Sequence, residues 1–315
     1  MTRLGIDDRL VAAVTEALSG CGLSLRASSS QEWQLSMARR RGIARIDDGW
    51  LALEFHPPRR RTPNPLRTLE RNAELRGSAK HVLLIDGSLR LRAEVPAEEP
   101  LGPEAAGLAL QVREAVAGLA SAMGASTPRT SSANETPSDS GAEEGASSSD
   151  PCTLCGEAGW SYSERSSGRL HVDLDVPGGA FYQAAVRRAG RHIVQRVELF
   201  ADDEAATDTL AGSAIAALLL SVSAVVRMVR AVSWRSAAGP AWGFEVQLPG
   251  KTAVGTFVHG LSALSVACGL CGREVRALAH DPVLARRYLE IRYRRLMPKR
   301  RALQRRSGAA QAVVS

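Results

Sequence analysis

The longest periodic pattern in the chain is an apolar stripe in its C-terminal third. Eight apolar positions between residues 254 and 278 are spaced alternately three and four residues apart, which places them on one face of a single long helix. A face of this kind is normally buried against another layer of protein. We therefore expect the stripe to pack between domains or against a partner. Its residues are Val254, Phe257, Leu261, Leu264, Cys268, Cys271, Val275 and Leu278.

The first 124 residues alternate between helical and strand-like patterns. Strand segments show apolar residues at every second position, and the turn signals Asp47-Asp48-Gly49 and Asp86-Gly87-Ser88 join them in pairs. The predicted order is helix 8–18, strands at 33–37, 43–46 and 51–55, helix 66–75, strands at 82–85 and 89–95, and a helix from about 108 to 124.

The second half repeats this order of elements. Alternation predicts strands at 170–176, 181–187 and 192–200, followed by one long helix from about 204 to 234, a strand at 244–248 and the striped helix, interrupted at Asp281-Pro282. Strands that form local sheets, with helices segregated from them, indicate the α+β class. The sequence therefore predicts two tandem α+β domains, each a small antiparallel sheet packed by helices.

A segment rich in Ser, Thr, Pro and Gly, residues 121–149, separates the two halves. Such a composition cannot bury a core and is typical of a linker. We predict a first domain at 1–124, a flexible linker with a CxxC motif at 125–168, a second domain at 169–291 and a basic tail at 292–315.

Composition limits the possible partners and the compartment. The net charge of +7 and a pI near 9.6 favour acidic partners or nucleic acid. The N-terminus lacks the apolar core of a secretory signal, and five cysteines do not make a disulfide framework, so we expect a cytoplasmic protein. Two uncharged stretches, 210–226 and 252–271, carry serines and glycines, so we interpret them as buried helices and expect no membrane span.

Two C-x-x-C-G motifs raise the possibility of a structural zinc site. Cys152 and Cys155 form the first pair, and Cys268 and Cys271 form the second. Four thiolates can hold zinc when they converge on one ion. The pairs are far apart in the sequence, however, and the second pair continues the apolar stripe, where reduced cysteine behaves as a small apolar residue. We favour packing and expect no metal and no cofactor, with the zinc site as an alternative.

Catalytic patterns are weak throughout the chain. Asp173 and Asp175 lie two apart on one strand face, but their alternation with Leu and Val is typical of a solvated sheet face. The phosphate-binding motifs GxxxxGK[ST] and GxGxxG do not occur. The sequence therefore favours a protein that is not an enzyme and predicts no catalytic residue.

The C-terminal segment is strongly basic and interleaves its cations with Tyr288 and Tyr293. Cations near aromatic side chains can bind nucleic acid, although cations are also common at solvated helix ends. Nucleic-acid binding is therefore an alternative function. The possible anion contacts are Arg287, Arg292, Arg294 and Arg295.

The pattern of the second half, through segments 221–231, 244–249 and 261–275, resembles the type III secretion chaperone-like fold, which includes the bacterial YbjN-type domains. The first half resembles it more loosely. The resemblance implies a non-enzymatic cytoplasmic module that binds another protein and is usually a homodimer. It also implies that two copies in one chain can pack as an intramolecular pseudo-dimer. We therefore expect a protein-binding module that uses apolar helix faces.

Overall fold

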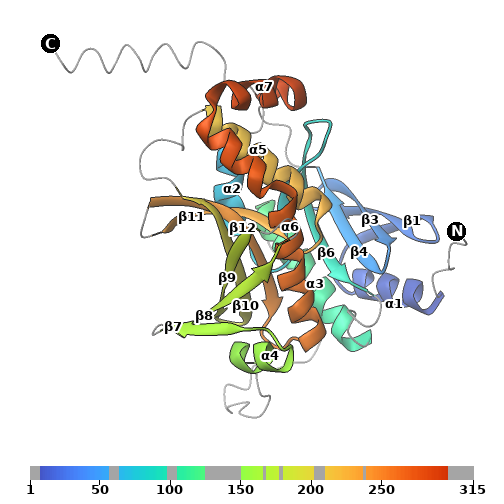
Figure 1. The fold of residues 1–315 in the computed structure, drawn as a ribbon. Coiled ribbons are helices and arrows are strands. Elements are labelled where there is room, and N and C mark those ends of the chain that lie inside the picture. The colour runs from blue at the N-terminus through green and yellow to red at the C-terminus, as the bar shows by residue number, and fades with distance from the viewer. Residues whose placement is uncertain are drawn as a thin grey trace, which may run out of the picture.

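Each half of the chain folds into a six-stranded antiparallel sheet covered by helices (Figure 1). The structure is a computed structural model. It describes residues 8–56, 64–97, 105–124, 150–165, 168–176, 180–201, 210–236 and 239–296. The prediction of an α+β protein with two tandem halves is confirmed.

In the described residues of the first half there are three helices and six strands, with the sheet order β1-β2-β3-β4-β6-β5. The alternation predicted at residues 33–37 is observed, with Trp33, Leu35 and Met37 buried beneath the helices. The elements are α1 (Asp8–Ser19), β1 (Ser24–Ser29), β2 (Glu32–Met37), β3 (Arg40–Asp47), β4 (Trp50–Phe55), α2 (Pro65–Glu74), β5 (Lys80–Leu83), β6 (Leu89–Pro96) and α3 (Ala105–Ala122).

The second half has the same topology, with the sheet order β7-β8-β9-β10-β12-β11, and adds helix α7 and a short 3-10 turn after its last equivalent helix. Each element of the first half therefore has one counterpart here. The elements are α4 (Pro151–Glu157), β7 (Tyr162–Arg165), β8 (Arg169–Asp175), β9 (Phe181–Ala189), β10 (His192–Ala201), α5 (Leu210–Val225), β11 (Arg230–Ser236), β12 (Gly239–Pro249), α6 (Val254–His280), α7 (Pro282–Arg292) and η2 (Arg294–Leu296).

The structure differs most from the prediction at two boundaries, and strand β1 has no predicted counterpart. The expected helix over 204–234 ends at Val225, and strand β11 follows it from Arg230. A continuous apolar run fits a buried strand as well as a buried helix, so periodicity could not separate the two. The expected linker over 125–168 contains helix α4 and strand β7, which pairs with β8. The second half therefore begins at about Asp150.

Three helices begin with the same N-cap motif, an Asn or Asp followed by proline. Asn64, Asp150 and Asp281 cap α2, α4 and α7, and each side chain accepts a hydrogen bond from a backbone N–H of the first turn. The proline at the first helical position loses no intrahelical hydrogen bond there. This signature explains why a helix starts directly after the Ser-rich segment.

The two halves meet through corresponding elements. Helix α2 packs on β11 and α5 of the second half, while α5 packs on β5 of the first half. Because α2 corresponds to α5 and β5 to β11, these contacts are reciprocal, as they are across a two-fold axis. The halves therefore pack on one another with pseudo-two-fold symmetry.

A buried lysine crosses this junction from the first half. Lys80, the first residue of β5, forms an ion pair of 2.6 Å with Glu94. Its Nζ also donates to the carbonyl oxygens of Val226 (3.2 Å) and Val229 (3.1 Å), in the loop between α5 and β11. Burial lowers the pKa of Lys80, and the charge of Glu94 opposes that shift. The lysine therefore holds the other half's loop by two hydrogen bonds.

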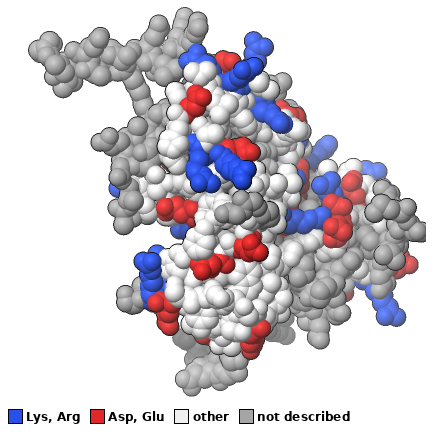
Figure 2. All heavy atoms as spheres, in the orientation of Figure 1, with Lys and Arg blue, Asp and Glu red and all other residues white. Residues whose placement is uncertain are grey.

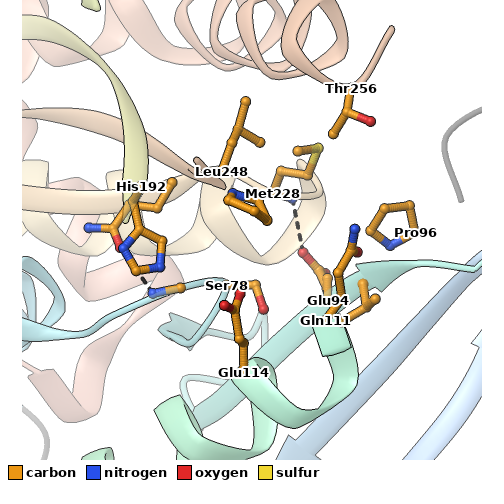
Figure 3. Close-up of a pocket in the computed structure, with 13 residues that line it drawn as sticks. Ser78, Glu94, Pro96, Gln111, Glu114, His192, Met228, Leu248 and Thr256 are labelled. Atoms are coloured by element: carbon orange, nitrogen blue, oxygen red, sulfur yellow. Dashed lines mark hydrogen bonds between the residues drawn. The ribbon is translucent and has the colours of Figure 1, made fainter. Parts of the chain in front are cut away.

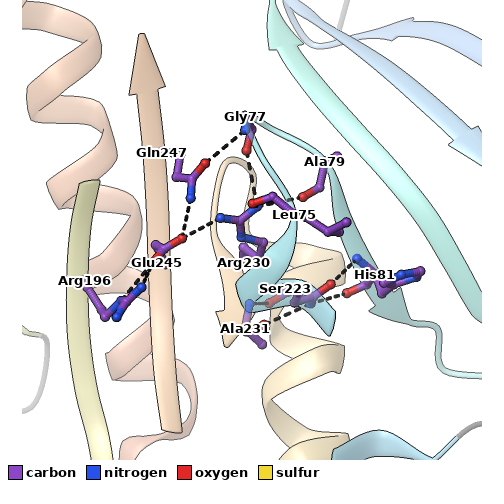
Figure 4. A network of polar contacts seen from close by, with 11 residues as sticks. Leu75, Gly77, Ala79, His81, Arg196, Ser223, Arg230, Ala231, Glu245 and Gln247 are labelled. Atoms are coloured by element: carbon purple, nitrogen blue, oxygen red, sulfur yellow. Dashed lines mark hydrogen bonds and ion pairs between the residues drawn. The ribbon is translucent and has the colours of Figure 1, made fainter. Parts of the chain in front are cut away.

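A buried arginine makes the reciprocal crossing (Figure 4). Arg230, the first residue of β11, donates from Nη1 to the carbonyl oxygens of Leu75 (2.9 Å) and Ala79 (3.1 Å), in the loop between α2 and β5. Its Nη2 pairs with Glu245, which Arg196 also contacts. Burial opposes ionisation of Glu245, but the two arginine charges outweigh it and hold the pKa of the carboxyl below its ordinary value.

The same correspondence extends to the backbone of the two loops. Gly77 N–H donates to the side-chain oxygen of Gln247 (3.0 Å), and Met228 N–H donates to Glu94 (3.1 Å). Both donors adopt left-handed backbone, with φ of 61° at Gly77 and 63° at Met228. Met228 holds a conformation that a residue with a side chain rarely adopts. Each loop therefore donates one backbone N–H to a side chain of the other half.

His81 gives this junction a predicted pH dependence. Its side chain is 8% exposed, and burial, aided by the charge of Arg71, lowers its pKa from 6.5 to about 4. Below pH 6.5 His81 is protonated in the unfolded chain, whereas in the folded chain it stays neutral until the pH reaches about 4. We therefore expect stability to be complete above pH 6.5 and to fall by about 3 kcal/mol as the pH decreases to about 4.

Urea unfolding followed over this pH range checks the His81 prediction. The variant His81→Leu lacks the titrating group and should lose less stability than the natural chain over the same interval. Equal slopes for the two proteins would show that His81 does not cause the pH dependence.

Candidate peptide-binding groove

The apolar stripe is buried, but not where the sequence predicted it. From Phe257 to Leu278 its residues are at most 3% exposed. Helix α6 packs mainly on β8, β9, β10 and β12 and on α4, α5 and α7 of its own half. Its His259, which is not part of the stripe, contacts the first half, with its ring 5.5 Å from that of Trp50. The stripe therefore covers its own sheet instead of forming the surface between the halves. The reason is that the sheet has an apolar face, which its own last helix covers first.

A close approach between α6 and the sheet requires a glycine. A Cβ atom added at Gly260 would clash with Oε1 of Gln195, whose Nε2 donates to the carbonyl oxygen of Phe257 (2.9 Å).

By length and composition alone, Val254–His280 could cross a membrane, and half of its most apolar window is buried inside the protein. Core helices of globular proteins have the same composition.

The four motif cysteines lie in the same apolar core without forming a metal site. Cys155, Cys268 and Cys271 are buried, and Cys152 is half-buried. Within the described residues, no three His, Cys, Asp or Glu side chains are placed to hold a metal ion. Burial raises the pKa of Cys155 to about 11 and that of Cys268 to about 12. These side chains are therefore thiols at neutral pH, and their arrangement among the described residues gives the zinc alternative no support.

A small cavity lies at the junction of the halves (Figure 3). Glu94, Gln111 and Glu114 line it from the first half, and His192 and Met228 line it from the second. Its volume is about 50 Å³, and Glu94 is already paired with Lys80. Ligand pockets usually enclose several hundred Å³. The cavity is therefore a packing gap between the halves rather than a metabolite site.

An open groove of about 600 Å³ lies at the outer end of the second sheet. Strand β7 pairs with β8 from Arg169 to Val172 only. Strand β8 then continues through Asp173–Asp175, paired with β9 on its other side. Gly159, with φ of 68°, turns the chain after α4 so that Trp160 and Ser161 stand away from β8. The groove therefore opens along a strand segment that has one neighbouring strand among the described residues.

Aromatic side chains line this groove. Trp160 and Phe181 are both among its lining residues; Trp160 is half-buried and Phe181 is 70% exposed. Leu174 and Val176 are buried beneath the groove. A large apolar side chain with this degree of exposure marks a surface that can bury area on binding.

Two carboxylates give the groove a negative charge in an otherwise basic protein. Asp173 and Asp175 are exposed and lie on the same face of β8. Asp173 accepts one hydrogen bond, from Nε2 of Gln183 at 2.9 Å. The carbonyl oxygen of Asp175 accepts from the Ser265 hydroxyl, which anchors this end of the strand on α6. The carboxylate groups themselves remain open to cations of a ligand.

The predicted anion contacts lie at the other end of the second half. Arg287 and Arg292 are exposed on α7, and Arg294 follows in the 3-10 turn. The side chain of Arg295 lies outside the described residues. Figure 1 shows α7 far from α4 and β7, so these arginines and the groove form separate surfaces.

Sequence reasoning identified part of the groove and missed its aromatic walls. The alternation around Asp173 and Asp175 indicates a solvated sheet face and does not show that they line a groove. Trp160 lies in the segment predicted as linker, although a capped helix followed by a turn at Gly159 indicates folded structure there. Phe181 is the first residue of β9, and nothing in its local pattern indicates exposure. In comparisons with family models, curated proteins and solved structures, nothing matched this chain.

Proposed function

We propose that this chain is a non-enzymatic, cytoplasmic protein-binding module whose groove receives an extended, basic segment of a partner protein. The observation that carries this proposal is that β8 at Asp173–Asp175 has a strand on one side only among the described residues, within a groove lined by aromatic side chains. An extended peptide can add to an exposed sheet edge through main-chain hydrogen bonds, with side-chain pockets supplying specificity.

The chemistry of the walls supports a basic ligand. Asp173 and Asp175 attract Lys or Arg, and the faces of Trp160 and Phe181 can stack on a guanidinium group. Carboxylates on both sides of Leu174 face the same way, since side chains alternate along a strand. A basic residue at every second position of the peptide would therefore meet them.

The α+β class of each half supports binding over catalysis, because it is the class that the chaperone-like resemblance implies. The proposal moves the contact surface from the apolar helix faces, which the protein's own sheets and junction cover, to the groove.

The experiment is selection of peptides from a random display library against the full chain, followed by calorimetry of the selected peptides. We expect extended peptides rich in Lys and Arg. Phe181→Ser and Asp173→Asn/Asp175→Asn should each weaken binding about fivefold, since a cation–π contact and a charge pair each contribute on the order of 1 kcal/mol. Binding should also weaken as salt increases.

Two matched controls separate the groove from general surface effects. Ile85→Ser removes an apolar side chain that is 80% exposed in the first half, and Glu198→Gln removes an exposed carboxylate on β10. Both should bind the selected peptides normally. Peptides that bind the groove variants and the natural chain equally well would refute the proposal.

A further inference from the structure

Helix α7 presents an outward face that the protein itself does not cover. Ala285 and Leu289 are buried where α7 packs on α5 and α6. On the opposite side, Val283 is 73% exposed and Ile291 is 71% exposed. Leu284 beside them is 41% exposed. The helix therefore has an apolar inner face and a second, exposed aliphatic face.

Arginines accompany these aliphatic side chains. Val283, Arg287 and Ile291 are four residues apart and lie along one side of the helix, with Arg286 next to them. Both arginines are exposed, and Glu290 is the single carboxylate on this face. Figure 2 shows Lys and Arg side chains gathered at the end of the molecule where α7 lies. The exposed face is thus both aliphatic and cationic.

The sequence continues this charge beyond the helix. From Arg286 to Arg306, ten of 21 residues are Lys or Arg, and Glu290 is the only acidic residue. Clusters of four to eight cations on or beside an amphipathic helix are typical of sites that bind anionic lipids. We therefore expect α7 and the basic sequence after it to bind a polyanion.

The orientation of the tyrosines decides between a membrane and a nucleic acid. Tyr293 is 5% exposed, and its ring lies 5.9 Å from that of Tyr288, edge to face. Burial raises the pKa of Tyr288, which packs against the core. Single-stranded nucleic acid is usually held by aromatic side chains on which bases stack. Here both tyrosines point inward, and aliphatic side chains occupy the outward face.

We propose that α7 docks the protein on the surface of an anionic lipid bilayer. Val283, Leu284 and Ile291 enter the boundary between headgroups and acyl chains, and Arg286 and Arg287 pair with lipid phosphates. Helices that lie in the membrane interface combine these two features, an apolar side and a cationic flank. Figure 1 shows α7 far from α4 and β7, and the groove is lined by residues that follow α4, so a docked molecule keeps the groove open to a partner.

The test is co-sedimentation of the full chain with vesicles of phosphatidylcholine and phosphatidylserine, against vesicles of phosphatidylcholine alone. We expect binding to the mixed vesicles, reduced at least tenfold by Val283→Ser/Ile291→Ser and, separately, by Arg286→Gln/Arg287→Gln. Val266→Ser/Leu270→Ser, which removes two half-exposed aliphatic side chains from α6, should bind as the natural chain does.

Several outcomes would overturn the proposal. These are failure to bind the mixed vesicles, equal binding to both kinds of vesicle, or no effect of the aliphatic variant. A duplex and a single-stranded oligonucleotide serve as competing ligands. If they bind tightly while vesicles do not, the basic end recognises nucleic acid instead. Peptide binding in the groove is measured separately, so either proposal can fail without the other.

Discussion

Replacing Arg230 with Met is expected to lower the free energy of unfolding by about 3–5 kcal/mol, because it leaves a buried carboxylate and several carbonyl groups without their donor. Arg230 is 3% exposed and donates across the junction to Leu75 and Ala79 as well as to Glu245. Methionine keeps the apolar volume of the side chain but donates no hydrogen bond. Urea unfolding at neutral pH measures the change.

A matched control lies on the other side of the same carboxylate. Arg196 also pairs with Glu245 and stacks over Trp234 at 4.8 Å, but its side chain is 23% exposed and all these contacts stay within the second half. Arg196→Met should therefore cost only about 1 kcal/mol. Equal costs for the two variants would mean that the contacts across the junction contribute little.

Replacing Lys80 with Met is expected to have an effect of similar size, about 3–5 kcal/mol. Lys80 is 1% exposed and is the reciprocal of Arg230, with Glu94, Val226 and Val229 as its acceptors. Its removal leaves the buried Glu94 with Arg92 at 3.6 Å and the N–H of Met228 as partners. The same urea experiment measures this loss.

A second substitution makes this prediction sharper. The position of Glu94 corresponds to that of Gln247 in the second half, which accepts a loop N–H without carrying a charge. Glu94→Gln added to Lys80→Met should therefore restore part of the lost stability, since it removes the unpaired charge and keeps the acceptor. Arg90→Met, which breaks a partly exposed pair with Glu54, should cost about 1 kcal/mol or less. If the double variant is no more stable than Lys80→Met alone, the ion pair between Lys80 and Glu94 is not the cause of the lost stability.

The sequence predicted the elements whose burial is one-sided. The strand at Trp33, Leu35 and Met37 and the helix of the stripe have clear periods because one face meets the core and the other meets water. Strand β11 lacks that contrast. Its first residues, from Arg230 to Val232, are all buried between the halves, so the strand continued an apolar helical run without a change of period.

The junction and the groove could not be predicted from the sequence, for a different reason. Lys80 and Arg230 are cations in buried positions, where such residues are rare unless they are paired, and their acceptors lie about 150 residues away in the chain. The groove likewise joins Trp160 to Asp173 and Phe181, which come from three separate elements or loops. Local patterns describe a segment and its burial, whereas these sites depend on which segments the topology brings together.

The reciprocal junction stabilises the two halves as one unit. Hydrogen exchange of the Arg230→Met variant tests it most directly, read from the backbone amides of β4 in the first half and β10 in the second. We expect protection in both strands to fall by the same free energy as the urea measurement gives. A loss of protection confined to β10, with β4 unchanged, would show that the halves are stable independently and would contradict the claim.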